Sequence, residues 1–134
     1  MEVEAFLICD AATDQYGKLN ILGAFDAIRA PVAPIVHPLF SVALRIRFAK
    51  SESANHPFRI NIINEDGKSI LTKPIDGNLN VQIRQADESA VINLIGNFRD
   101  IKFEKFGRYS IDLTMDGKQR GSLPLFIKCV KQQA

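Results

Sequence analysis

The 134-residue sequence has no tryptophan, only two cysteines and two histidines, and no long apolar run. No window reaches the roughly 18 apolar residues that a membrane-spanning helix needs, so we expect no transmembrane segment. The start, MEVEAFLICD, carries acidic side chains where a signal peptide would carry basic ones, and its apolar run is short. These absences predict a cytoplasmic protein with no membrane partner.

An excess of charge of one sign is also missing. The chain has 17 basic and 15 acidic side chains, and its formal net charge is +2. Neither an anionic membrane nor a nucleic acid would be attracted strongly by such a balance. The sequence also lacks a pattern of aromatic and basic residues interleaved along the chain, in which the aromatic rings would stack on nucleic-acid bases. We therefore expect no nucleic-acid partner.

The two cysteines, Cys9 and Cys129, lie near opposite ends of the sequence. They could form a disulfide only if the terminal strands ran side by side. Disulfides are rare in the cytosol, and unpaired cysteines are often buried. The sequence therefore favours two reduced and largely buried thiols, with a disulfide as the alternative.

What the sequence does contain is alternation of apolar and polar residues. In LFSVALRIRF (39–48), every second residue is apolar, which is the period of a strand with one buried face. The run RYSIDLTMD (108–116) has the same period. The expected buried residues are Phe40, Val42, Leu44, Ile46 and Phe48 in the first run, and Tyr109, Ile111, Leu113 and Met115 in the second.

Turn residues separate these runs. Asp66-Gly67 and Asp116-Gly117 are residue pairs that tight hairpins favour. Pro31, Pro34 and Pro38 lie in the segment APVAPIVHP, where proline removes backbone donors from any strand ladder. A chain of this length is usually one domain, and it needs no disulfide or metal for stability. We therefore expect residues 1–134 to form a single all-β domain, an antiparallel Greek-key (immunoglobulin-like) sandwich of about seven to nine strands.

The segment FEKFGRYSIDLTMDGKQRGSLPLFIK resembles the last two strands of an immunoglobulin-like domain. A tyrosine before the penultimate strand is typical of the tyrosine corner of such sandwiches, and its hydroxyl group bonds to the backbone a few residues upstream. We expect Tyr109 to bond to the 104–107 segment and Gly107 to permit the bend. The tryptophan and the inter-sheet disulfide of antibody domains are absent.

Over its whole length the chain resembles a family of small, one-domain bacterial proteins of unknown function. The resemblance is carried by EAFLICDAATDQYGKLNILGAFDAI, HPLFSVALRIRF and KFGRYSIDLTMDGKQRGSLPLFI. It implies a bacterial, cytoplasmic setting. It implies no catalytic residue and no ligand.

Candidate chemistry is sparse. Asp10, Asp14, Asp26 and His37 would form one loop site if the first hairpin and the proline-rich stretch meet, and this is the basis of an alternative function as a small ligand-binding protein or enzyme. The segment DAATDQYGK fits no calcium-loop spacing, so we interpret its aspartates as turn residues. Neither His37 nor His56, each followed by proline, has metal-ligand partners at a typical spacing. We expect no metal and no cofactor.

Four arginines form a second candidate site. Arg45 and Arg47 share the polar side of one expected strand, and Arg59 and Arg84 would extend this basic face if their strands were adjacent. Such a face could grip an acidic partner or a phosphate group. The simpler interpretation is that the arginine side chains cover the outside of a sheet and pair with carboxylates.

Some expected strands are apolar on both sides. LNILGAFDAI and SAVINLIGNF have this property, and Phe126 lies opposite the inward side of its own strand. Large exposed apolar patches usually mark interfaces, and symmetric dimers commonly cover them. We therefore expect a non-enzymatic protein-interaction or self-association module, a homo-oligomer or the partner of another protein. Its candidate interface residues are Leu22, Phe25, Ile28, Val91, Ile95 and Phe126.

Overall fold

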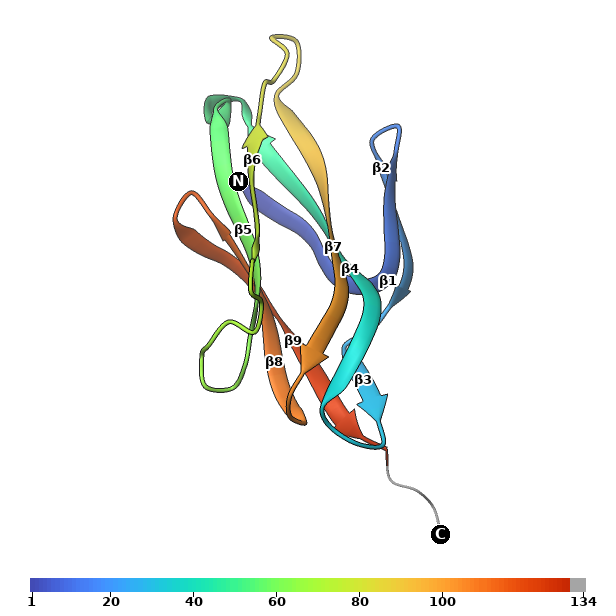
Figure 1. The fold of residues 1–134 in the computed structure, drawn as a ribbon. Helices are drawn as coiled ribbons and strands as arrows, with labels where there is room; N and C mark the ends of the chain where they lie inside the picture. Colours follow the sequence, from blue (N-terminus) through green and yellow to red (C-terminus); the bar gives the residue numbers. More distant parts are fainter. Residues whose placement is uncertain (131–134) are drawn as a thin grey trace.

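The computed structural model describes residues 1–130, which form two packed β-sheets (Figure 1). Sheet A has the strand order β2-β1-β4-β7, and sheet B has the order β3-β9-β8-β5-β6. Within the described part of the chain the one helical element is a short 3₁₀ turn, η1 (Lys50–Glu52), and no helix is long and apolar enough to cross a membrane. The strands are β1 (Glu2–Gln15), β2 (Lys18–Ala24), β3 (Ala27–Ala30), β4 (Ile35–Ala49), β5 (Asn55–Ile63), β6 (Ile75–Asn80), β7 (Ser89–Phe103), β8 (Gly107–Met115) and β9 (Lys118–Cys129).

Neighbouring strands are antiparallel except at one edge of sheet B, where β3 runs parallel to β9. The short connection between β2 and β3 carries the chain from one sheet to the other. Its backbone is bonded to both sheets: Phe25 N donates to the carbonyl of Ile8, and Phe126 N donates to the carbonyl of Asp26. These two bonds hold the first and last parts of the chain together.

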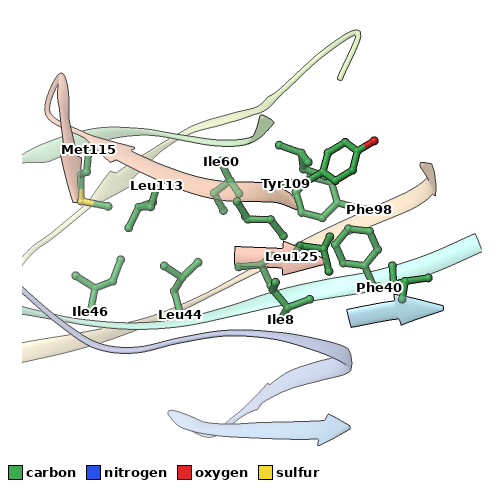
Figure 2. Close-up of a cluster of buried hydrophobic side chains, with 14 of the residues drawn as sticks. Ile8, Phe40, Leu44, Ile46, Ile60, Phe98, Tyr109, Leu113, Met115 and Leu125 are labelled. Carbon is green, nitrogen blue, oxygen red and sulfur yellow. The ribbon is translucent and has the colours of Figure 1, made fainter. Parts of the chain in front are cut away.

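The core lies between the sheets and is built from the alternating strands (Figure 2). The inward residues expected in 39–48 and 108–116 are all buried. The prediction of one buried face is confirmed for β8, but in β4 Ser41 and Ala43 on the opposite face are buried as well. Full burial of each large apolar side chain stabilises the fold by about 1.5–3 kcal/mol. The sheets are therefore held together mainly by β4 from sheet A and β8 from sheet B.

A hairpin formed by β1 and β2 folds back over the outer face of sheet A. Its turn uses Tyr16 and Gly17, with φ angles of 51° and 78°. Asn93 Nδ2, on β7, donates to Asp14 Oδ1 at 3.3 Å and to the carbonyl of Gly17 at 3.1 Å. Because β4 lies between β1 and β7 in the sheet, these bonds require the hairpin to curl across β4.

Both predicted Asp-Gly pairs lie at turns. At Asp116-Gly117 both φ angles are positive (54° and 76°), and the expected hairpin joins β8 to β9. Gly67 also turns the chain, and a short hairpin closes there: Asn64 N donates to the carbonyl of Lys68, and Ile63 forms an isolated antiparallel bridge with Ser69. The next named strand, β6, begins at Ile75. β6 ends at Asn80, which pairs with Asn55, the first residue of β5.

Candidate functional site

The edge strand β7 has an unusual exposure pattern. Every residue from Ser89 to Ile95 is half-buried, whereas the neighbouring strand β4 is fully buried over Phe40–Leu44. Successive residues of a strand face opposite sides. Neither face of this half of β7 is therefore completely covered. In the described residues β4 is the only strand that pairs with β7.

Apolar side chains are also exposed elsewhere on sheet A. Leu7 on β1 and Leu39 on β4 are each 41% exposed, and Leu22 on β2 is 69% exposed. In the folded-back hairpin Leu19 lies opposite Asp14, whose side chain contacts β7, and Leu19 is half-buried. The hairpin therefore covers part of the outer face of sheet A and leaves the rest accessible.

The other candidate interface residues occupy different environments. Ile28 is buried in the core and lies on no exposed surface. The Phe25 ring is half-buried, with its centroid 6.3 Å from the ring centroids of His37 and Phe40. Phe126 lies on the outside of sheet B beneath two cations, the guanidinium of Arg108 and the ammonium of Lys128. Only Leu22, Val91 and Ile95 belong to the accessible part of sheet A.

The four arginines are not brought together. Arg45 and Arg47 lie on β4 in sheet A, and both bond to the carboxylate of Glu4, at 3.0 and 2.6 Å. Arg59 lies on β5 in sheet B, and its Nε bonds to Asp76 at 2.6 Å. Arg84 is in the connection between β6 and β7. Three of the four thus pair with carboxylates, and no single basic face results.

The acidic loop site is assembled in part. Asp10 and His37 line one open cavity of about 430 Å³, together with residues of the β2–β3 connection and β3. Gly23 brings the β2 backbone close to Asp10, since an added Cβ would lie 2.5 Å from Asp10 Oδ2. Asp14 is at the hairpin turn bonded to Asn93, and Asp26 follows Phe25 in the connection. Only two of the four residues therefore line a common cavity.

A second cavity, of about 340 Å³, was not foreseen. It lies beside Tyr109, and its acidic lining residues are Glu65, Asp66 and Glu104. Glu65 Oε1 accepts a hydrogen bond from Arg108 N at 2.8 Å. The β5–β6 and β7–β8 connections that form this cavity are far apart in sequence, so no local pattern could have revealed it.

The chemistry of the remaining candidates is limited. Among residues 1–130 no group of three or more His, Cys, Asp or Glu side chains is placed to hold a metal ion. Both cysteines are free: Cys9 is buried, as expected, but Cys129 is exposed, contrary to the prediction of two buried thiols. Burial and the nearby charge of Asp10 raise the pKa of the Cys9 thiol.

Comparison with known proteins places the chain without assigning a function. Residues 4–128 match a protein family described as a family of unknown function, DUF6941. No curated protein matches the chain.

Proposed function

Since the chain belongs to the DUF6941 family, whose function is unknown, we propose from its own surface that it is a non-enzymatic β-sandwich module that self-associates through sheet A. The observation that supports this is the half-buried run Ser89–Ile95 on an edge strand. An edge strand with accessible apolar side chains is a ready template for another strand.

The surrounding surface supports the same proposal. Leu7, Leu22 and Leu39 expose apolar area on sheet A, whereas the outer face of sheet B is mostly polar and includes the pairs Arg59–Asp76 and Ser122–Asp112. The apolar exposure is therefore concentrated on one of the two sheets. Large exposed apolar patches mark interaction sites.

Light scattering coupled to size-exclusion chromatography tests this function. At tens of micromolar, a concentration at which interfaces of roughly micromolar affinity are occupied, we expect the mass of a dimer. A monomer at every concentration up to about ten times higher would overturn self-association.

We also propose that the sandwich is of the immunoglobulin-like, Greek-key type. The parallel pairing of β3 with β9 supports this, as does the tyrosine corner. Tyr109 Oη donates to the carbonyl of Lys105 at 2.7 Å, and Lys105 N donates to Tyr109 Oη at 3.3 Å. The expected bond to the 104–107 segment is therefore present. An experimental structure whose strand connections depart from that topology would overturn this assignment.

A second candidate function is small-ligand binding in the cavity shared by Asp10 and His37. The observation in its favour is that a carboxylate and an imidazole line the same cavity. A ligand that binds there would raise the melting temperature of the wild type but not of an Asp10→Asn/His37→Gln variant. A panel of calcium, phosphate and small amines that shifts neither protein would remove this candidate.

A further inference from the structure

We infer that β7 pairs with β7 of a second copy of this chain, antiparallel and about a two-fold axis at Asn93, so that the two copies of sheet A form one continuous sheet. This inference rests on the proposed self-association and specifies its surface. In Figure 1, β7 is the orange strand beside β4, at the end of sheet A opposite the β1–β2 hairpin.

The four sheet edges differ in how they are protected. The other edge strands are short, with 7 residues in β2, 4 in β3 and 6 in β6, whereas β7 has 15. Natural edge strands are usually kept from pairing by short length, charged side chains, proline or bulges. The run SAVINLIGNF (89–98) has no charged residue and no proline. The first two thirds of β7 therefore lack these protections.

The end of β7 is different. Arg99, Asp100 and Lys102 carry charge, and Asp100 has a φ angle of 51°. A positive φ at a non-glycine residue interrupts the regular ladder geometry. Pairing with a second copy should therefore use the residues before Asp100.

Symmetry restricts the register. When two identical antiparallel strands are related by a two-fold axis perpendicular to the sheet, a residue on one face must pair with a residue on that same face. With the axis at Asn93, Val91 lies opposite the partner's Ile95, and Ile92 lies opposite the partner's Leu94. Each of these aliphatic side chains thus faces another aliphatic side chain, which stabilises a strand pair.

The charge of Arg99 disfavours an alternative register. Glu88 and Arg99 flank the uncharged run and are both exposed, and β7 begins only at Ser89. With the axis at Asn93, the paired segment ends with Ser89 opposite the partner's Asn97, so Arg99 lies beyond it. With the axis shifted to Ile95, Val91 would instead lie opposite the charged Arg99. A charge opposite an aliphatic side chain does not stabilise a strand pair.

The partial exposure of side chains on both faces of β7 is consistent with one added strand at its edge. Val91 and Ile95 lie on the outer face, and Ile92 and Leu94 on the face toward the core, yet all four are half-buried. A ligand seated on one face of the sheet would cover only one of these pairs. A second strand at the edge covers side chains on both faces at once.

Cysteine cross-linking tests this inference. In a Cys129→Ser background, a Val91→Cys/Ile95→Cys variant places two thiols opposite two partner thiols, at Cα separations of roughly 4.5–5.5 Å, which suit a disulfide. Within one chain residues 91 and 95 are about 13 Å apart along the strand, so they cannot bond to each other. Mild oxidation should give a covalent dimer on a non-reducing gel, and each single cysteine variant should give none.

The outcomes separate the inference from the proposed function. A dimer in light scattering without cross-linking by the double variant would overturn the β7 pairing and leave self-association intact. Cross-linking by Ile95→Cys alone would move the axis to Ile95 and overturn the register. A monomer in light scattering would overturn both.

Charge substitutions give a readout that does not depend on cross-linking. Val91→Lys/Ile95→Lys should raise the Kd of the dimer about ten-fold or more while the circular dichroism spectrum is retained, because lysine on an edge opposes pairing. The matched control is Val32→Lys, an exposed apolar residue in the connection between β3 and β4, and it should leave the dimer unchanged. A dimer disrupted by Leu22→Lys on β2 and not by the β7 variant would overturn the inference.

Discussion

His56 Nδ1 lies 2.7 Å from Asp116 Oδ2, and His56 Nε2 lies 2.7 Å from the carbonyl oxygen of Glu52. Both neighbouring atoms are acceptors, so both contacts are hydrogen bonds only when the ring is a doubly protonated imidazolium. The Glu52 carbonyl and then the Asp116 carboxylate raise the pKa of His56, although burial opposes them. The ring thus joins η1 and β5 to the turn between β8 and β9.

This arrangement predicts that stability depends on pH. Because the folded-state pKa of His56 lies above the unfolded value, near 6.5, the stabilisation is fully present below that value. It is lost as pH rises through the folded pKa. His56→Gln should therefore lower the free energy of unfolding by about 1–3 kcal/mol at pH 5.5, and by less at pH 8.5. Urea unfolding at a series of pH values measures this difference.

The second histidine provides the control. His37 packs with the rings of Phe25 and Phe40 and not with Asp116 or Glu52. His37→Gln removes an imidazole but leaves the contacts of His56 with Glu52 and Asp116 in place, so it is the comparison variant in the same unfolding series. A His56→Gln variant whose stability difference from the wild type is constant between pH 5.5 and 8.5 would contradict the assignment.

The two tyrosines, Tyr109 and Tyr16, allow a matched test of the hydrogen bonding at the tyrosine corner. Tyr109 is 5% exposed and bonds to Lys105, whereas Tyr16 is 97% exposed. Tyr109→Phe should lower the free energy of unfolding by about 1–2 kcal/mol, since it removes both hydrogen bonds that the hydroxyl group makes with the Lys105 backbone. Tyr16→Phe should have no measurable effect in the same denaturation experiment. Equal effects of both substitutions would show that the hydroxyl bond is not stabilising.

Thiol labelling should distinguish the two cysteines. Cys129 is exposed, while Cys9 is buried and its thiol pKa is raised by that burial. A thiol reagent acting on the native protein should modify one cysteine rapidly, and a second only in denaturant. Mass spectrometry of the native and unfolded protein measures the stoichiometry. Rapid labelling of both thiols in the native protein would indicate that the β1–β4 region opens readily.

The paired arginines predict weak binding of polyanions. Glu4 engages Arg45 and Arg47, and Asp76 engages Arg59, so the wild type should elute early from heparin at low salt. A Glu4→Gln/Asp76→Asn variant should be retained longer, because three guanidinium groups lose their carboxylate partners. Asp66→Asn/Glu88→Gln, with the same change in net charge, is the control. Equal retention of the two variants would mean that net charge alone decides the binding.

Local sequence patterns predicted the parts of the fold that depend on one strand. Alternation identified the buried residues of β4 and β8, and the Asp116-Gly117 pair identified a hairpin, because side-chain direction and turn geometry are local properties. The role of Tyr109 was predicted because its partner, Lys105, is only four residues away. The uncharged, two-sided apolar run of β7 was also visible in the sequence.

Properties that depend on which strands become neighbours could not be read in this way. The four arginines could share one face only if their strands were adjacent, but β4 and β5 belong to different sheets. The fold-back of the first hairpin depends on Asn93, which is 79 residues from Asp14. Ile28 was assigned to the surface because its run is apolar on both sides, yet β3 joins sheet B beside β9, where Ile28 is buried. Each of these differences arises from long-range pairing.

The parallel pair of β3 and β9 has a consequence for synthesis of the chain on the ribosome. Sheet B cannot close at this edge until residues 118–129 have emerged, although β3 is made near the start. Contacts between such distant segments form late and slow down folding. During that interval the uncharged run 89–98 of β7 is already outside the ribosome and is not yet covered by a complete sandwich. Nascent chains that have passed residue 103 but lack β9 should therefore be the species most prone to aggregate and most dependent on chaperones.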